Sequence, residues 1–234
     1  MNDNLLLRVL PESDRALLAP SLERVALRCG TVLEMPRQPT SHAFFLESGL
    51  AAVVAHQPNR RIGIGVVGCD GITAMEVIHN ADRAANETIV QADGTALRIE
   101  RETLRAAMER SPTLRHVLLR YAHFFEVQSS QTALTNCHAL VEERLARWIL
   151  MSHDRMKDDV LRVTHQFIAL MLGVRRAGIT SAIHILEGRH LVKSRRNSLE
   201  VLDRQGLIDI TNGVYGICEE EYEHLIDRTF RQAA

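Results

Sequence analysis

The distribution of glycine and proline constrains the fold of this chain more than any other feature. Between residues 22 and 100, short β-prone runs alternate with glycines such as Gly30, Gly49 and Gly94, which suit turns that need a positive φ. After Pro112 the chain contains no proline or glycine until Gly173, so this region can form long uninterrupted helices. The sequence therefore predicts an α+β protein with a β-rich N-terminal part and a helical continuation.

The β-rich part contains several short candidate strands. They cover residues 22–29, 43–46, 50–56, 62–67, 88–91 and 96–99. Many short strands with regular turns are typical of a sandwich, a barrel or a rolled sheet. Residues 1–20 are expected to form one or two short helices ahead of it.

The composition is that of an ordinary globular protein. Of 234 residues, 46% are hydrophobic and 24% are charged, and this length favours two structural units. No apolar run approaches the roughly 18 residues that span a bilayer, and the first residues lack the basic start of a signal peptide. We therefore expect a cytoplasmic protein without a membrane partner. Cysteines 29, 69, 137 and 218 form no C-x-x-C motif and are expected to be small buried residues.

Ser111 and Pro112 predict the start of a long helix, because serine caps the first turn and proline is tolerated at its first position. An apolar stripe continues to about residue 135. It consists of Leu114, Val117, Leu118, Tyr121, Phe125 and Gln128. Such a helix is on the order of 35 Å long. We favour pairing of this stripe with a second copy of the chain over packing on the β-rich part of the same chain.

A second amphipathic helix is expected over residues 140–151. Its inward residues would be Leu145, Trp148, Ile149 and Met151, and its outward residues Glu142, Glu143, Arg144 and Arg147. Residues 154–159 are polar and predict a loop. We therefore divide the chain into a β-domain (1–111), a dimerisation helix (112–137) and a C-terminal domain (138–234).

Residues 164–187 have the layout of a helix-turn-helix. Thr164 can cap a helix that ends at Gly173, and a second helix begins two or three residues later. Ile179, Ala182, Ile183 and Leu186 recur at helical spacing and predict the inward face of the second helix. The opposite face presents Arg176, Ala177, Thr180, Ser181 and His184. This face has the size and polarity to enter a DNA major groove.

A basic β-hairpin is predicted directly after this helix, over residues 191–202. Two short runs flank Arg196 and Asn197, and asparagine tolerates the left-handed conformation of a tight turn. Lys193, Ser194, Arg195 and Arg196 would lie at its tip, where they could contact phosphates. A solvated basic face on a packing domain is the simpler alternative.

The net charge of -1 conceals a strongly uneven distribution. Residues 160–202 contain seven basic and two acidic side chains, a balance of +5, whereas residues 203–234 contain three basic and seven acidic ones, a balance of -4. Because local charge decides phosphate binding, we expect double-stranded DNA as the partner. Thr164, Arg175, Arg176, Thr180, Ser181 and His184, together with the four hairpin residues, are the candidate contacts.

Over almost its full length the sequence resembles the Crp/Fnr superfamily of bacterial transcription regulators. The motif Glu143-Arg144-Leu145-Ala146-Arg147-Trp148 is similar to the helix that precedes the DNA reader, and residues 45–53 resemble a glycine-centred hairpin of the sensor domain. The resemblance implies an N-terminal cyclic-nucleotide-binding-like β-roll, a long dimerising helix and a C-terminal winged helix. It also implies that Arg176 reads a guanine. Ala177 and Ser181 replace a glutamate and an arginine of better-known members, so a different target sequence is implied.

The sensor half departs from the pattern of the family. Cyclic-nucleotide binders use a Gly-Glu-Leu turn, whose glutamate holds the ribose, and a following arginine that pairs with the phosphate. The corresponding stretch here runs from Gly71 to Asn86 and retains Arg83, but no carboxylate stands in the ribose position. We therefore expect no cyclic AMP, and Arg83 is an effector candidate whose alternative role is a surface ion pair. Cys29 and Cys69 alone cannot hold an iron–sulfur cluster, so no cofactor is expected.

An enzyme is not expected. The eleven histidines show no metal-binding spacing, and neither a phosphate loop nor a nucleophile motif is present. The leading hypothesis is a homodimeric regulator that binds a palindromic DNA site and also contacts RNA polymerase, with an effector at the β-roll as an option. The alternatives are a small-molecule sensor whose output is a protein contact and, last, a β-roll metalloenzyme.

Overall fold

The N-terminal half is a rolled β-sheet with short helices at its start. The computed structural model describes residues 3–156 and 158–226. Helices α1 (Leu5–Val9) and α2 (Glu12–Leu18) and the 3-10 turn η1 (Ala19–Ser21) lead into the strands. The strands are β1 (Glu23–Leu27), β2 (Val32–Glu34), β3 (His42–Leu46), β4 (Leu50–Gln57), β5 (Arg60–Val67), β6 (Glu87–Ala92) and β7 (Gly94–Glu100). The predicted strands are thus present, with β2 added.

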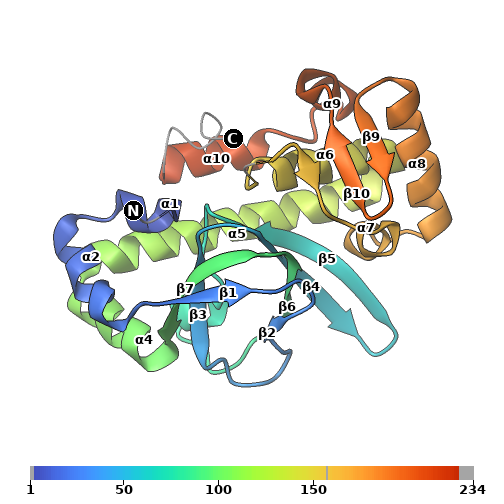
Figure 1. Cartoon of the computed structure of the whole chain (residues 1–234). Helices are drawn as coiled ribbons and strands as arrows, with labels where there is room; N and C mark the ends of the chain where they lie inside the picture. Colours follow the sequence, from blue (N-terminus) through green and yellow to red (C-terminus); the bar gives the residue numbers. More distant parts are fainter. Residues whose placement is uncertain (1–2, 157, 227–234) are drawn as a thin grey trace.

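The strands form two antiparallel sheets that roll over one another (Figure 1). One has the order β1-β7-β3 and the other β2-β6-β4-β5. Helix α3 (Met75–Ile78) lies between β5 and β6 in the chain, and α4 (Arg101–Arg110) follows β7. Neither helix is among the elements predicted above, although Leu104, Ala107 and Met108 of α4 are buried at helical spacing.

Helix α5 (Pro112–His138) is the long helix that the sequence predicts. The Ser111 hydroxyl accepts a hydrogen bond from the Leu114 N–H at 3.1 Å, which caps the first turn. Leu114, Leu118, Tyr121, Phe125 and Gln128 are buried, but against the β-roll and other helices of the same chain. The expectation that this stripe packs against a second copy of the chain is therefore wrong: the β-roll and other helices of the same chain already cover it.

The C-terminal half is a winged helix-turn-helix. It contains α6 (Val141–His153), β8 (Val160–Leu161), α7 (His165–Leu172), α8 (Arg176–Gly188), β9 (Val192–Arg195), β10 (Ser198–Val201), α9 (Arg204–Ile210) and α10 (Ile217–Leu225). A small antiparallel sheet has the order β8-β10-β9. Helix α10 leaves this half and packs along α5.

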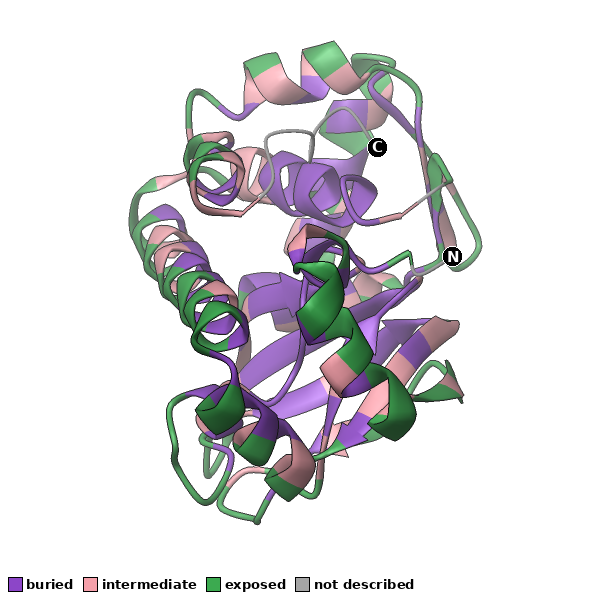
Figure 2. Ribbon diagram, turned by 90° about the vertical axis from the view of Figure 1, so that its left-hand side faces the viewer, coloured by how far each residue is buried: buried purple, intermediate pink, exposed green. Residues whose placement is uncertain are grey.

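The two halves share one hydrophobic core. Val54 and Val66 of the β-roll belong to the same buried cluster as Trp148 of α6, Met171 of α7 and Ile183 of α8. Figure 2 shows buried residues on the inner strands and central helices, with exposed residues on the outer faces. The winged half is therefore packed firmly onto the sensor half.

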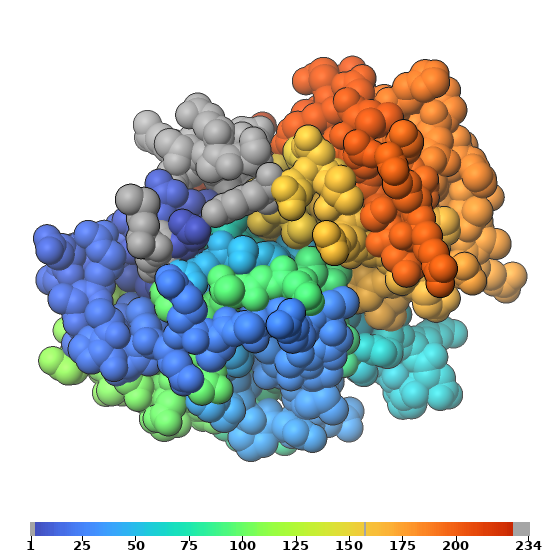
Figure 3. All heavy atoms as spheres, viewed as in Figure 1, coloured from blue at the N-terminus to red at the C-terminus, as the bar shows by residue number. Residues whose placement is uncertain are grey.

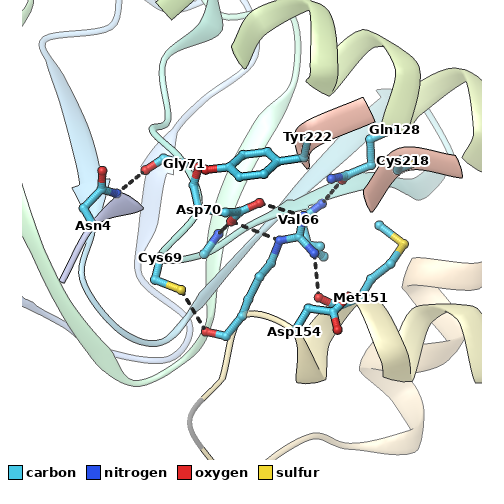
Figure 4. Close-up of polar contacts among 12 residues, drawn as sticks. Asn4, Val66, Cys69, Asp70, Gly71, Gln128, Met151, Asp154, Cys218 and Tyr222 are labelled. Carbon is cyan, nitrogen blue, oxygen red and sulfur yellow. Dashed lines mark hydrogen bonds and ion pairs between the residues drawn. The ribbon is translucent and has the colours of Figure 1, made fainter. Parts of the chain in front are cut away.

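A buried ion pair joins the same two halves. The side chains of Asp70, which follows β5, and Arg155, which follows α6, are both fully buried and lie 2.7 Å apart. Arg155 also donates from Nε to Asp70 at 3.1 Å and from Nη1 to the Met151 carbonyl at 2.7 Å. The Tyr222 hydroxyl of α10 donates to the Asp70 carbonyl at 2.8 Å (Figure 4). Although burial alone would lower the pKa of Arg155, the carboxylates of Asp70, Asp154 and Glu219 raise it.

Near this ion pair one sequence expectation is confirmed and another is wrong. Residues 154–156 and 158–159 form the predicted loop, although its residues Asp154 and Arg155 are buried. Arg147, expected on the outer face of α6, is 6% exposed because α10 covers it. Its guanidinium donates to Thr132 at 3.2 Å and to the Cys218 sulfur at 3.7 Å.

In the described part of the chain, no single helix is both long and apolar enough to cross a membrane. Helices α7 and α8 reach that apolarity only when taken together, and they are bent by 104°.

Candidate nucleic-acid interface and effector cavity

The turn between α7 and α8 is fixed by a cap at one end and a glycine at the other. The Thr164 hydroxyl accepts a hydrogen bond from the Phe167 N–H at 3.1 Å, which starts α7. Gly173 has a φ of 61°, a left-handed conformation that ends the helix at little cost for glycine. Helix α8 then begins at Arg176, as the sequence predicts.

Helix α8 is divided into a buried and an exposed face. Ile179, Ala182, Ile183 and Leu186 are all buried in the core of the winged half. Arg176, Ala177, Ser181 and His184 are exposed, and Thr180 is half-buried. The Thr180 and Ser181 hydroxyls donate to the carbonyls of Arg176 and Ala177, each at 3.2 Å. The exposed face therefore carries short hydrogen-bonding groups behind a terminal arginine, which suits contact with base edges.

Arg175 and Arg176 lie on the surface at the start of α8. No described carboxylate lies within ion-pair distance of either guanidinium. Both cations are thus available to an anionic partner, which is the arrangement that phosphate or guanine recognition requires.

The basic hairpin is a wing held against α8. Strands β9 and β10 pair in register from Ser198 opposite Arg195 to Val201 opposite Val192. Asn197 adopts a φ of 59° in the turn. The Ser194 N–H donates to the Glu187 carboxylate of α8 at 2.7 Å, which ties the wing to the helix. Lys193, Arg195 and Arg196 are exposed, and Ser194 is half-buried.

The ten predicted contact residues therefore lie on three neighbouring elements. Thr164 begins α7, five residues belong to the turn and exposed face of α8, and four belong to the wing. Glu200 partly offsets the charge of the wing, since it lies 3.7 Å from Arg195. The remaining cations give this surface its positive charge.

A second candidate site is a cavity of about 490 Å³ between the β-roll and α5. Arg83 lines it, as do Thr73, Ala74 and Met75 from the stretch that corresponds to the cyclic-nucleotide cassette. Glu34, Glu76 and Glu126 supply carboxylates, and Phe125 and Ser129 close the cavity from α5. The sequence points to Arg83 but not to Glu34, because Glu34 reaches the cavity from a strand remote in the chain.

Glu34 is the most perturbed group of this cavity. Its two carboxylate oxygens accept hydrogen bonds from the Ala74 N–H and the Thr88 hydroxyl, each at 2.6 Å. Burial, reinforced by the neighbouring carboxylate of Glu76, raises the pKa of Glu34 to about 7. A perturbed carboxyl group in a cavity is typical of a functional site.

The histidines remain scattered. Within residues 3–156 and 158–226, no three His, Cys, Asp or Glu side chains gather in a way that could hold a metal ion. His184 lies 3.5 Å from Glu187 on α8, and His153 lies 2.8 Å from Asp159.

Comparison with known proteins agrees with this geometry. Residues 143–210 match the family described as the Crp-like helix-turn-helix domain. No curated protein matches the sequence. Several solved structures share the fold across both halves.

One is a putative transcriptional regulator of the Crp/Fnr family from Eubacterium rectale. It is 18% identical, with a TM-score of 0.69, and the match covers 91% of this chain and 100% of that one. The Crp/Fnr-family regulator TTHA1359 from Thermus thermophilus is 18% identical, with a TM-score of 0.64 and coverage of 82% and 99%.

The c-di-GMP-responsive global regulator CLP from Xanthomonas campestris is 16% identical, with a TM-score of 0.65 and coverage of 82% and 99%. All three proteins are described as regulators. The resemblance read from the sequence is thereby confirmed in its domain family and in its fold. The chain contains a Crp-like helix-turn-helix domain within the fold of the Crp/Fnr transcriptional regulators.

Proposed function

We propose that this protein is a sequence-specific DNA-binding transcription regulator. The observation that carries the proposal is the exposed face of α8, which places small hydrogen-bonding groups behind two arginines that pair with no described carboxylate, next to a basic wing. Arg176, Thr180, Ser181 and His184 would read base edges in the major groove. Thr164, Arg175 and the wing residues Lys193, Ser194, Arg195 and Arg196 would hold phosphates.

A homodimer would present two such helices to one palindromic site, with half-sites about 34 Å apart. Because the inner stripe of α5 is covered by the β-roll, we assign pairing to its outer stripe. Leu119 and Leu134 are 39% and 54% exposed, and Cys137 at the end of the helix is exposed as well, contrary to the expectation that all four cysteines are buried. Leu119 and Cys137 are separated by about five helical turns and therefore lie on the same face.

The cavity beneath α5 is the proposed effector site. Arg83 would meet an anionic group, whereas Glu34, Glu76 and Glu126 would oppose a ligand with several negative charges. These carboxylates favour a ligand that is less anionic than a nucleotide. Contact with RNA polymerase, in the bacterial cytoplasm, would turn DNA binding into a change of transcription.

DNA selection with the purified protein tests the proposal. A random duplex pool is enriched at 50 and 200 mM salt, and we expect a palindromic motif whose affinity falls steeply with salt as counterions are released. Repeating the selection with cyclic nucleotides tests whether the cavity accepts them. A pool without an enriched motif would contradict DNA reading, and salt-insensitive capture of a protein would favour a protein-contact output.

A further inference from the structure

The β4–β5 hairpin of the sensor half touches the helix-turn-helix directly. A Cβ atom on Gly63 of β5 would lie 2.3 Å from the Met171 methyl group of α7. A Cβ atom on Gly173, in the turn before α8, would lie 2.6 Å from Cδ1 of Ile62. Both glycines therefore permit an approach that a larger side chain would obstruct. Figure 3 shows the hairpin, in cyan, against the orange surface of the winged half.

This contact leaves a cleft of about 850 Å³ beside the start of α8. His56, Asn59, Arg60 and Arg61 line it from the hairpin. Gln166, Arg175 and Arg176 line it from the helix-turn-helix. Among the described residues that line this cleft, there is no aspartate or glutamate.

The four arginines that line this cleft differ in whether they form an ion pair with a carboxylate. Arg61 forms an ion pair with Glu87, which also lies 2.7 Å from His56. Arg60, Arg175 and Arg176 are exposed, and no described carboxylate pairs with any of them. The cleft therefore concentrates three uncompensated cations, one of which belongs to the sensor half.

We propose that this cleft binds phosphate groups of the DNA that α8 reads, with Arg60 as a DNA contact from the sensor half. The inference rests on the proposed function, because Arg175 and Arg176 belong to the surface that would meet DNA. A duplex on the exposed face of α8 has its backbone beside the first residues of that helix. Of the two arginines that the sensor half places there, Arg60 is the one that pairs with no described carboxylate, and the packing of Ile62 on Gly173 holds the hairpin in position.

The same hairpin also reaches the effector cavity. Val53 of β4 and Ile64 of β5 line that cavity, while Arg60 and Arg61 of β5 line the cleft. A ligand beneath α5 would therefore contact the two strands that carry the additional DNA contact.

The variant Arg60→Gln tests this inference against Arg110→Gln. Arg110 is an exposed arginine at the end of α4, so both variants remove one surface charge. Fluorescence anisotropy would measure the affinity for the selected duplex and for a scrambled duplex from 50 to 300 mM salt. We expect Arg60→Gln to reduce the slope of log affinity against log salt by about one and to weaken both duplexes about 3- to 10-fold at low salt. Arg110→Gln should match the wild type.

Each other outcome has a defined meaning. If the wild type binds DNA and Arg60→Gln has the same affinity and salt slope, this inference fails while the proposed function stands. Tighter binding by Arg60→Gln would show that the hairpin obstructs DNA and would also overturn it. If calorimetry shows pyrophosphate binding that requires Arg60 while DNA binding does not, the cleft takes a free phosphate compound instead. If the wild-type protein binds no duplex, the result contradicts both this inference and the proposed function.

Discussion

At the scale of single residues, the exposed cations of α8 and the wing differ in what they can recognise. Arg176 begins the helix whose exposed face would enter the groove, whereas Arg196 lies in the turn of the wing. Base contacts discriminate between sequences, and phosphate contacts do not. Identical charges on neighbouring elements should therefore have different effects on specificity.

We predict that Arg176→Ala relaxes the preference at one base pair by about 1–3 kcal/mol, because a bidentate guanine contact is lost. Arg196→Ala should weaken cognate and scrambled duplexes equally and lower the salt slope by about one. Competition binding with single-base variants of the selected site measures both effects. If Arg176→Ala instead weakens binding to all duplexes equally, Arg176 contacts the DNA phosphate backbone and not a base.

Glu34 should make stability depend on pH. Its pKa rises from 4.5 to about 7 on folding, so between these values the folded state retains a proton that the unfolded chain releases. Stability therefore decreases as pH rises through this window and levels off above about pH 7, a total change on the order of 3 kcal/mol at most.

We predict that Glu34→Gln flattens this dependence and stabilises the protein at pH 8 by about 1–3 kcal/mol. A glutamine can still accept from the Ala74 N–H and can donate to the Thr88 hydroxyl. Urea unfolding at pH 5, 6, 7 and 8 measures the effect, with Glu109→Gln on the surface of α4 as the control. Parallel pH curves for Glu34→Gln and the wild type would contradict it.

At the scale of elements, the sequence predicts the helices and turns whose ends are marked by capping residues, glycine or asparagine. Helices α5 and α7 have side-chain caps at Ser111 and Thr164, and Gly173 and Asn197 mark two turns by their left-handed conformations. Strands β2 and β8 and helix α3 span two to four residues each, too few for a periodic pattern. Their neighbours in the fold stabilise them, so local sequence does not reveal them.

The outer stripe of α5 yields a prediction about assembly. In a parallel pair related by a two-fold axis, Cys137 of each copy would lie near the other. In a Cys29→Ser background, mild oxidation should therefore produce a disulfide-linked dimer on a non-reducing gel. The dimer should disappear in Cys29→Ser/Cys137→Ser.

Leu134→Glu should shift the protein toward the monomer in light scattering, because it places a charge on the same stripe. Leu134 is 54% exposed, so the fold itself should tolerate the change. A wild-type protein that remains monomeric at micromolar concentration would contradict the pairing through α5.

At the scale of the whole molecule, buried charges join the sensor and the winged halves. The Asp70–Arg155 pair is fully buried, whereas the side chains of the surface pair Arg28–Asp93 are 78% and 61% exposed. Removing one partner of a buried pair leaves an uncompensated charge in the core, whereas a surface pair contributes little. The two pairs therefore form a matched comparison.

We predict that Asp70→Asn destabilises the protein by about 3–5 kcal/mol, while Asp93→Asn costs about 0–1 kcal/mol. The double variant Asp70→Asn/Arg155→Met should recover part of the loss, because neither member of the pair then carries a charge. Urea unfolding measures all three. Equal effects of the two single variants would show that this ion pair does not stabilise the docked halves.

The helix-turn-helix, the wing and the exposed face of α8 are predictable from local sequence, because caps, glycines and apolar spacing act within a few residues. Long-range packing, by contrast, directs the apolar stripe of α5 toward its own chain and buries Arg147 and Arg155. It also brought Glu34 to Ala74 and Thr88, and Arg60 to the cleft beside Arg175. These features depend on contacts between residues far apart in the chain. Local apolar periodicity predicts which residues are buried, but it does not predict which residues they pack against.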